Sequence, residues 1–301
     1  MGTGEERYIS AFDKDFPEKL KNIPMPPAGI YVKGALPNPE IPSVAIIGAR
    51  EASAYGISVA RYFSRELSKA GIQIISGMAR GIDGTAQREA ILSGGFSFGV
   101  LGCGTDIIYP RENADIFKKI LDAGGLISEY PVGTAPKKLR FPARNRIISA
   151  LSDCILVVEA REKSGTKITV SHALEQGKDI LAVPGRIYDP LSRGCNSLIA
   201  DGAAPALSPE SVLEVLGIFR DKGRTKDSLN KNLEEKLSSE ERDVLHCLDF
   251  DPKGLEEIIN DRKLKDVARE RIISILLKLQ LLGLVNEIGR QKYHLTDKIL
   301  K

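Results

Sequence analysis

The chain has 301 residues, with 43 Lys and Arg against 40 Asp and Glu, which gives a formal net charge of +3. This length permits two domains and a sizeable core. The near-neutral charge excludes a uniformly basic nucleic-acid protein, so any affinity for nucleic acid must come from local clusters of Lys and Arg.

The spacing of cysteine and histidine excludes two further classes. The 4 cysteines and 3 histidines are isolated from one another, without a C-x-x-C pair. We therefore expect no metal site and no disulfide framework. The first residues lack a signal-peptide pattern, and no apolar run approaches the ~18 residues of a membrane span. These features predict a cytoplasmic protein that does not contact a membrane.

Residues 1–42 are a proline-rich lead-in. The prolines between Pro17 and Pro27 prevent a long helix, and residues 30–33 could form a short strand. We expect this segment to be an arm that packs on the core of the following domain.

A regular alternation of apolar runs and helical stretches begins at Ser43. The apolar runs, each predicted to be a strand, are 44–47, 72–76, 98–101, 126–128, 154–158 and 179–183. The helical stretches between them are 55–70, 84–92, 113–123, 144–151 and 166–176. This alternation is typical of βαβ units around a buried parallel sheet. We therefore expect residues 43–217 to form an α/β domain with a Rossmann-like, doubly wound parallel sheet.

The remaining chain predicts a second, smaller domain. Residues 218–236 are mixed charged and polar, as in a linker, and Ser238 and Glu241 then have the spacing of a capping box. The predicted elements of residues 237–301 are helices at 238–248, 254–260 and 267–282 and strands at 284–287 and 292–295. This order indicates a winged-helix domain. Because its acidic and basic residues balance, a protein-contact or autoregulatory role is as well supported as DNA binding.

Ligands of an open parallel sheet bind outside the carboxyl ends of its strands. Most of the predicted strands end in a glycine-containing turn or before a helix, where backbone N–H groups can approach a phosphate. The residues that we expect to cradle phosphates are Gly77, Gly81, Gly102, Gly104, Thr105, Ser164, Gly165 and Thr166. We refer to these segments together as the strand-end edge.

The stretch 137–146, with the sequence KKLRFPARNR, holds five basic side chains, no acidic one and the single aromatic Phe141. Cations for phosphates and a ring for a base are the components of a single-strand nucleic-acid site, although a charge run alone is more often a solvated loop. Its position after the fourth predicted strand places it at the strand-end edge and favours the nucleic-acid interpretation. We expect Arg50, Arg80, Lys138 and Lys167 to line this edge and Phe141 to stack a base.

The motifs of enzymes with this fold class are missing. The segment GAREAS at 48–53 has Arg50 where a dinucleotide-binding motif needs its second glycine, and no Walker A or G-x-S-x-G motif occurs. Gly165 and Thr166 resemble part of the motif of lysine-decarboxylase-like nucleotide hydrolases, but Thr169 stands where those enzymes have an acid. We therefore predict no catalytic residue and no cofactor.

Four carboxylates could lie near the predicted cleft: Asp83, Asp106, Glu129 and Glu159. We expect them to cap helices, support glycine loops and orient arginines. Asp83, just before a predicted helix, would be its N-cap.

The motifs together resemble those of the DprA/Smf family of DNA-processing proteins, over roughly residues 13–205. The longest are SGMARGID at 76–83, FPARNRII at 141–148, VVEA at 157–160, SGT at 164–166 and GCNSLI at 194–199, joined by Tyr109-Pro110, Ser128-Glu129 and Pro184-Gly185. The chain departs from the family pattern at three positions. Gln87 replaces the usual histidine, and Lys167 and Val170 replace an apolar residue and an alanine.

This resemblance implies a non-catalytic protein that binds single-stranded DNA, protects incoming transforming DNA and loads the RecA recombinase onto it. It also implies a homodimer formed through the Rossmann-like domain. The family's DNA-binding positions correspond here to Arg50, Arg80, Lys138, Phe141, Arg144 and Arg146. Arg144 and Arg146 could also be partly structural and anchor the helix that follows.

Two other functions stay open from the sequence. One is an enzyme acting on small nucleotides, which the missing acid at Thr169 disfavours. The other is a protein-only adaptor that acts through the neutral winged-helix domain.

Overall fold

The computed structural model describes residues 5–218, 237–265 and 267–296. Its contacts divide the chain into two compact units, Met1–Phe219 and Arg220–Lys301. Nearly all of the predicted linker, residues 219–236, lies outside the described residues.

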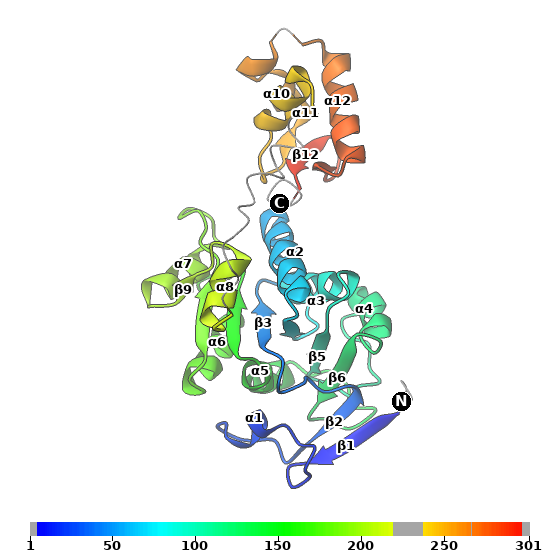
Figure 1. Cartoon of the computed structure of the whole chain (residues 1–301), viewed down its shortest axis with the longest axis vertical. Coiled ribbons are helices and arrows are strands. Elements are labelled where there is room, and N and C mark those ends of the chain that lie inside the picture. Colours follow the sequence, from blue (N-terminus) through cyan, green and yellow to red (C-terminus); the bar gives the residue numbers. More distant parts are fainter. Residues whose placement is uncertain (1–4, 219–236, 266, 297–301) are drawn as a thin grey trace. The chain divides into compact units, whose positions relative to one another are not determined.

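A nine-stranded sheet organises the first unit, in the order β1-β2-β6-β5-β4-β3-β7-β8-β9 (Figure 1). All neighbouring pairs from β6 to β9 along this order are parallel. These strands are β3 (Ser43–Ile47), β4 (Gln73–Ser76), β5 (Ser97–Leu101), β6 (Gly124–Ser128), β7 (Cys154–Val157), β8 (Asp179–Ala182) and β9 (Ala204–Pro205). The predicted parallel sheet is confirmed, and β3 to β8 coincide with the predicted apolar runs.

Helices cover both faces of this sheet (Figure 1). They are α2 (Ala54–Lys69), α3 (Ile82–Leu92), α4 (Ala114–Lys119), α5 (Arg140–Leu151), α6 (Thr166–Glu175), α7 (Arg193–Ala200) and α8 (Pro209–Val215), with a 3₁₀ turn η1 (Arg111–Asn113) before α4. Side chains alternate across each strand. Val44 and Ile46 of β3 pack with α2, α3 and α8, whereas Ala45 and Ile47 pack with α5 and α6. The doubly wound arrangement predicted from the sequence is therefore present.

The direction of the chain across the sheet reverses at β3. From β3 the chain proceeds to β4, β5 and β6 on one side, and then crosses to β7, β8 and β9 on the other. The carboxyl ends of β3 and β7 therefore flank a topological switch point. Loops diverge from such a point, so it is the place where ligands of this sheet architecture bind.

The proline-rich lead-in is part of the sheet itself. It forms β1 (Glu6–Ser10), α1 (Glu18–Lys21) and β2 (Gly29–Gly34). Strand β2 pairs antiparallel with both β1 and β6, and its Ile30 and Val32 are fully buried. The short strand expected at 30–33 is confirmed. The expectation of an arm lying on the core was incomplete, because these apolar side chains extend the core beyond β6.

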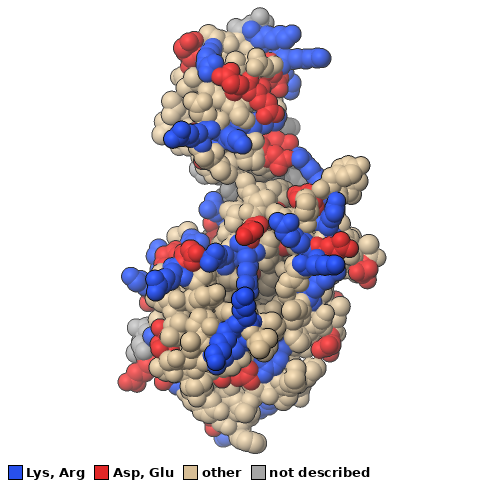
Figure 2. All heavy atoms as spheres, turned by 180° about the vertical axis from the view of Figure 1, so that it is seen from behind, with Lys and Arg blue, Asp and Glu red and all other residues tan. Residues whose placement is uncertain are grey.

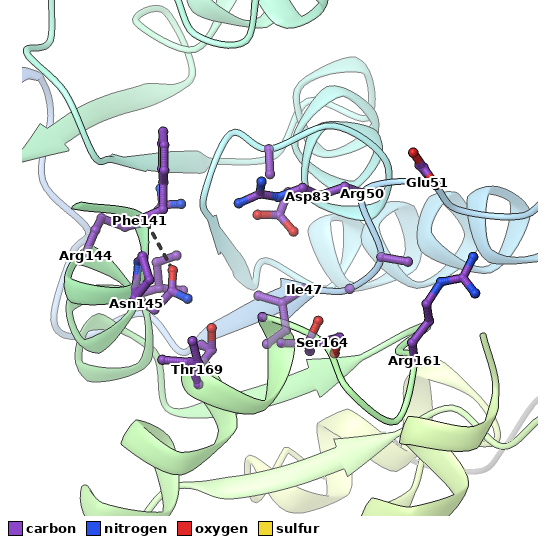
Figure 3. Close-up of a pocket in the computed structure, with 18 of the residues that line it drawn as sticks. Ile47, Arg50, Glu51, Asp83, Phe141, Arg144, Asn145, Arg161, Ser164 and Thr169 are labelled. Atoms are coloured by element: carbon purple, nitrogen blue, oxygen red, sulfur yellow. Dashed lines mark hydrogen bonds between the residues drawn. The ribbon is translucent and has the colours of Figure 1, made fainter. Parts of the chain in front are cut away.

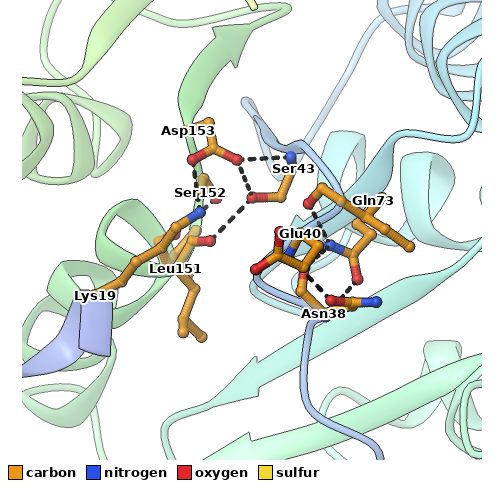
Figure 4. Close-up of polar contacts among 10 residues, drawn as sticks. Lys19, Asn38, Glu40, Ser43, Gln73, Leu151, Ser152 and Asp153 are labelled. Carbon is orange, nitrogen blue, oxygen red and sulfur yellow. Dashed lines mark hydrogen bonds and ion pairs between the residues drawn. The ribbon is translucent and has the colours of Figure 1, made fainter. Parts of the chain in front are cut away.

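Polar contacts fasten the lead-in to the amino-terminal ends of the strands (Figure 4). Lys19 Nζ lies 2.6 Å from Asp153 Oδ1, and the backbone N–H of Ser43 donates to Asp153 Oδ2 at 2.8 Å. Burial alone would raise the pKa of Asp153, but the hydrogen bonds from Lys19 and Ser43 outweigh it and hold that pKa below its usual value. This ion pair therefore joins α1 to the start of both β3 and β7.

The second unit has its own apolar core. Its elements are α10 (Ser239–Cys247), β10 (Lys253–Gly254), α11 (Leu255–Ile259), η2 (Arg262–Leu264), α12 (Arg269–Leu281), β11 (Val285–Glu287) and β12 (Lys292–Leu295). The three strands pair in the order β10-β12-β11. The capping box is confirmed, since Ser238 accepts from the N–H of Glu241 and Glu241 accepts from the N–H of Ser238. The elements fall where they were predicted, and their identification as a winged helix stays a prediction.

Candidate nucleic-acid interface

A cleft of about 430 Å³ lies at the switch point, between the carboxyl ends of β3 and β7 (Figure 3). Its walls come from the turn after β3, the first turns of α5, and the loop leading into α6. Its lining includes Ile47, Gly48, Arg50, Glu51, Asp83, Phe141, Arg144, Asn145, Ile148, Arg161, Ser164, Gly165, Thr166, Ile168, Thr169 and Leu191. We name this the switch-point cleft.

A second cleft of about 210 Å³ shares part of this lining and adds Arg80, Tyr109 and Pro110. We name it the aromatic cleft. Arg50, Phe141 and Arg144 line both clefts, so the two are neighbours. On the face drawn in Figure 2, Lys and Arg side chains gather over the middle of the first unit, with some Asp and Glu among them.

Phe141 lies at the boundary of the two clefts. Its ring stacks on that of Tyr109, with centroids 5.4 Å apart and an interplanar angle of 26°. The Arg50 guanidinium lies 5.8 Å from the Phe141 centroid. Helix α5 begins at Arg140 and not near Arg144 as predicted, so the ring is presented by the first turn of a helix and not by a loop.

Tyr109 is the aromatic residue that composition did not single out. It is 41% exposed and lines the aromatic cleft beside Phe141. The signal that could have identified it was its place in the Tyr109-Pro110 motif shared with the DprA/Smf family. Gly102 lies behind the Phe141 ring, since an added Cβ at Gly102 would be 2.9 Å from Phe141 Cδ1.

Arg144 is buried, at 4% exposure, and is held by backbone carbonyls. Its Nη1 donates to the carbonyl of Gly77 at 2.8 Å and also to that of Val100. Burial lowers its pKa to about 10, against the opposing effect of Asp83. An added Cβ at Gly77 would lie 2.6 Å from Arg144 Nη2, so this glycine is required for the close approach. Arg144 therefore fixes the glycine loop after β4 while one edge faces the clefts.

The expected N-cap role of Asp83 is wrong. Helix α3 begins at Ile82, and its N-cap is Gly81, which has a φ of 70° and no side-chain hydrogen bond. Asp83 instead lies in the first turn, where its carboxylate accepts from the N–H of Gly77 at 3.1 Å. Burial raises the pKa of Asp83, and Arg144 partly offsets this effect. Its predicted support of the glycine loop is confirmed.

The other carboxylates have the structural roles that were expected. Glu159 accepts from the N–H of Ser53 at 3.0 Å and from its hydroxyl, and Ser53 caps α2. Burial raises the pKa of Glu159. Asp106 accepts from the N–H of Gly133 at 3.0 Å. These contacts position the loops around the clefts.

Arg146 lines neither cleft. It is 6% exposed, its Nη2 lies 2.7 Å from Glu129 Oε1, and its Nε donates to the carbonyl of Met25 at 2.8 Å. Two residues apart on α5, Arg144 and Arg146 point to different faces of the helix. We therefore assign Arg146 a structural role, with Glu129 as the carboxylate that orients it.

The remaining predicted cations are exposed. Arg80 lines the aromatic cleft and pairs with Glu112 at 3.1 Å. Lys138 and Lys167 line neither cleft. Lys167 lies between the lining residues Thr166 and Ile168, and Lys138 precedes the lining residue Phe141 by three positions. Arg161, which sequence reasoning did not select, lines the switch-point cleft. Within the described residues, neither Arg50 nor Arg161 forms an ion pair.

The residues predicted to cradle phosphates divide into two groups. Ser164, Gly165 and Thr166 line the switch-point cleft, and Gly77 lines the aromatic cleft. The others support the fold and line neither cleft: Gly81 approaches the carbonyl of Ala49, Gly102 approaches the Phe141 ring, Gly104 lies against Asp106, and the Thr105 hydroxyl donates to Glu6. Gln87 also has a supporting role, accepting from the N–H of Met78 at 3.0 Å.

Two classes of site are not found among the residues that the structure describes. Across residues 5–218, 237–265 and 267–296, no group of three or more His, Cys, Asp or Glu is placed to hold a metal ion. No described helix has both the length and the apolarity needed to cross a membrane.

Residues 7–217 match the sequence model of a family described as DNA recombination-mediator protein A. The chain is 33% identical to Protein Smf of Synechocystis sp. over 95% of this chain and 79% of that protein. It is 41% identical to the DNA processing protein DprA of Bacillus subtilis over 69% of this chain and 70% of that protein. The structure resembles that of DNA processing protein A from Helicobacter pylori, studied for its single-stranded DNA binding mode, with a TM-score of 0.63 and 29% identity over 71% of this chain and 96% of that one.

Proposed function

The chain belongs to the DNA recombination-mediator protein A family, and we propose on this premise that it binds single-stranded DNA at the strand-end edge in a DNA-processing role. The H. pylori relative with a single-stranded DNA binding mode supports the choice of ligand. The observation that carries the proposal is the arrangement of Arg50, Phe141 and Tyr109 at the meeting of the two clefts.

This arrangement suits a single strand because it provides both a stacking surface and a cation. Base–aromatic stacking contributes ~1–3 kcal/mol per base and tolerates any sequence. The exposed Tyr109 and the half-buried Phe141 offer ring surface beside Arg50. Bases inside a duplex could not reach this surface, because they are already stacked and paired. We therefore expect a preference for single strands over duplex DNA.

Phosphate contacts would come from exposed cations along the edge. Arg50, Arg80, Lys138 and Lys167 were predicted for this role, and Arg161 joins them. Each phosphate contact to a single strand contributes about −0.7 to the slope of log K against log salt concentration. A strand that contacts several of these cations should therefore dissociate markedly as salt is raised.

Fluorescence anisotropy with a labelled oligo-dT tests this proposal. Arg50→Ala and Lys138→Ala should each weaken binding several-fold and make the salt slope less negative by about 0.7. Lys14→Ala is the matched control, because Lys14 is exposed in the lead-in and lines neither cleft. Equal affinities for wild type and both cleft variants at one salt concentration would show that the site is elsewhere.

We also propose that the bound strand is passed to the RecA recombinase and that the protein acts as a non-catalytic homodimer. The family description, a recombination mediator, supports the first statement, and the resemblance of the motifs supports the second. RecA ATPase activity on oligonucleotide coated with single-strand-binding protein should rise when the protein is added. Light scattering should give twice the 32.8 kDa chain mass. A monomer in light scattering would contradict the proposed homodimer, and an unchanged RecA ATPase activity would contradict the proposed transfer to RecA.

The paired cations and exposed leucines of α12 in the second unit favour a role in protein contact over independent DNA binding. The cations of α12 are paired with acids, as Arg269 with Glu256 at 2.7 Å, Arg271 with Glu240 at 2.9 Å and Lys278 with Glu241 at 2.6 Å. Leu277 and Leu281 on the same helix are 56% and 89% exposed. We therefore expect deletion of residues 237–301 to reduce the effect on RecA while leaving oligonucleotide affinity within a factor of two.

A further inference from the structure

The loop between β8 and α7, residues 183–192, continues the strand-end edge beyond the switch-point cleft. Strand β8 pairs parallel with β7, whose carboxyl end flanks that cleft. Leu191 of the loop lines the cleft itself, and its carbonyl accepts from the N–H of Ala160 at 2.8 Å. Figure 3 places Arg161, the residue after Ala160, at the opposite side of the cleft from Phe141. The loop therefore lies next to the side of the cleft that is far from Phe141.

Tyr188 in this loop presents an aromatic ring that the fold does not use. It is 84% exposed, and the neighbouring Ile187 is 70% exposed. Neither belongs to the two apolar cores that cover the sheet, and no aromatic ring of the described residues stacks on Tyr188. Single exposed apolar residues are common on protein surfaces, so the surroundings of the ring must decide whether it has a function.

The backbone that carries Tyr188 is anchored on both sides. Before it, the N–H of Gly185 donates to Asn196 Oδ1 at 3.1 Å, and Asn196 Nδ2 donates to the Gly185 carbonyl at 3.0 Å. After it, the N–H of Leu191 donates to Asp189 Oδ1 at 2.9 Å. A tyrosine has only two side-chain torsions to fix, so a ring on a held backbone binds at a low cost in conformational entropy. Tyr188 is therefore suited to act as a stacking surface.

The side chains around the loop are mainly cationic. Residues 161–167 lie beside it, since the N–H of Gly194 donates to the carbonyl of Ala160 at 2.8 Å. The basic side chains of these two segments are Arg161, Lys163, Lys167, Arg186 and Arg193. Arg161 and Arg193 are exposed, and neither forms an ion pair with any residue that the structure describes. They are therefore placed to receive the phosphates of a ligand that passes along this side of the edge.

The acidic side chains do not cancel this charge. The two segments contain only the carboxylates of Glu162 and Asp189, and Asp189 is engaged by the N–H of Leu191. Exposed aromatic rings beside cations are the components of a surface that binds single-stranded nucleic acid. The excess of cations disfavours an uncharged apolar partner, and continuity with the cleft through Leu191 and Arg161 favours the same ligand as the cleft.

We propose that the bound DNA strand continues from the clefts past Arg161 to this loop, where Tyr188 stacks a further base and Arg193 contacts a phosphate. The inference rests on the proposed function, because it lengthens the path of the same ligand. Base–aromatic stacking tolerates every base. The second contact therefore adds affinity and extends the length of strand that the protein covers, without adding a sequence preference.

Tryptophan fluorescence tests the contact directly. The chain contains no tryptophan, so Tyr188→Trp introduces a single indole at an exposed position that should not disturb folding. Stacking of a thymine on this indole should quench its emission when oligo-dT of about 16 nucleotides, the upper end of known single-strand site sizes, is added. Phe12→Trp is the matched control, because Phe12 is 97% exposed in the lead-in and lines neither cleft. Its emission should not change on addition of the same oligonucleotide.

Affinity measurements on the full chain give a second test. Tyr188→Ala should weaken binding of the same oligo-dT at least about 5-fold, the lower end of the effect of losing one base–aromatic stack. Tyr188→Phe should bind as wild type does, because the ring stacks and the hydroxyl is not required. Phe12→Ala should also leave the affinity unchanged. Light scattering of Tyr188→Ala should give the same mass as wild type.

The inference is overturned if the introduced indole keeps its emission while oligo-dT binds, or if Tyr188→Ala binds as tightly as wild type. A lower mass for Tyr188→Ala would also overturn it, because the ring would then serve contact between copies of this chain. Failure of the proposed function is a separate result, in which oligo-dT does not bind the wild-type chain or Arg50→Ala leaves its affinity unchanged. Weaker binding by Arg50→Ala together with no effect at Tyr188 would remove this inference alone.

Discussion

Arg144 and Gly77 join helix α5 to the loop after β4, with Arg144 Nη1 donating to the Gly77 carbonyl at 2.8 Å. The same guanidinium donates to Val100 at the end of β5 and faces the carboxylate of Asp83. One buried cation therefore holds together three segments of the strand-end edge. The exposed residues that we propose for DNA contact are placed by this buried framework.

Arg144→Met should lower the free energy of unfolding by about 3 kcal/mol, because it leaves the Asp83 carboxylate and two carbonyls without their partner. Urea unfolding of the full chain measures this loss. Arg50→Met is the control and should stay within about 0.5 kcal/mol, since Arg50 is exposed. A double variant with Asp83→Asn should recover part of the loss. Equal stability of both single variants would contradict the structural role of Arg144.

Two glycine substitutions should distinguish the contribution of the Phe141 ring to DNA binding from that of the N–H groups at the start of α6. At Gly102 an added Cβ would lie 2.9 Å from Phe141, whereas at Gly165 no atom lies within 4 Å of it. Gly102→Ala should therefore displace the ring and lower both stability and oligo-dT affinity. Gly165→Ala should leave the stability unchanged or raise it by about 0.4–1 kcal/mol, while weakening binding because the new methyl group obstructs the N–H groups of α6.

Melting curves and oligo-dT titrations of these two variants give the comparison. An unchanged affinity for Gly165→Ala would remove the N-terminus of α6 from the proposed phosphate contacts. An unchanged affinity for Gly102→Ala would show that Phe141 can move without loss of its function.

The sheet was predictable because its strands are apolar runs that end in glycine-containing turns. The runs at 44–47 and 154–158 became β3 and β7 with only small changes of boundary. The lead-in was harder to place, because its pairing with β6 depends on contacts between residues nearly a hundred positions apart. The strand itself was expected at 30–33, but so short a segment, with only Ile30 and Val32 fully buried in it, did not indicate which strand it would pair with.

The sequence identified several of the residues that line the site, but it did not show which of them are exposed to a ligand and which are buried and structural. Charge and position identified Arg50 and Phe141 correctly as cleft residues. Composition could not distinguish Arg144 and Arg146 from exposed cations, because their burial depends on carbonyls and carboxylates supplied by β4, β5 and β6. Thr169 was considered only as the position of a missing acid, whereas the structure places it in the lining of the switch-point cleft.

The ion pair of Lys19 and Asp153 should give the protein a characteristic acid sensitivity. The folded-state pKa of Asp153 is lowered, so the pair contributes stability that is fully present above the unfolded value of about 3.9. That contribution is lost as the pH falls through the folded pKa. Asp153→Asn should therefore be less stable than wild type at pH 7, and the difference should shrink below about pH 4.

Urea unfolding at pH 7, 5 and 3 tests this dependence. Lys19→Met should reproduce the pattern, because it removes the other partner, and the double variant should be no less stable than the sum of the two single variants predicts. A stability difference that stayed constant from pH 7 to pH 3 would mean that the pair does not lower the pKa.

Because the lead-in forms part of the sheet, truncating one of its buried apolar side chains should markedly lower the free energy of unfolding. Ile30→Ala in β2 should lower the free energy of unfolding by roughly 2–5 kcal/mol, because Ile30 is fully buried in the core that β2 shares with β6. Phe12→Ala is the control, since Phe12 lies in the same segment but is exposed, and it should cost no more than about 0.5 kcal/mol. An arm that merely rested on the core would open locally before the rest unfolds, and Ile30→Ala would then change urea unfolding as little as Phe12→Ala does. Hydrogen exchange distinguishes the two cases directly, because amides of β2 in an integral strand should exchange as slowly as those of β6.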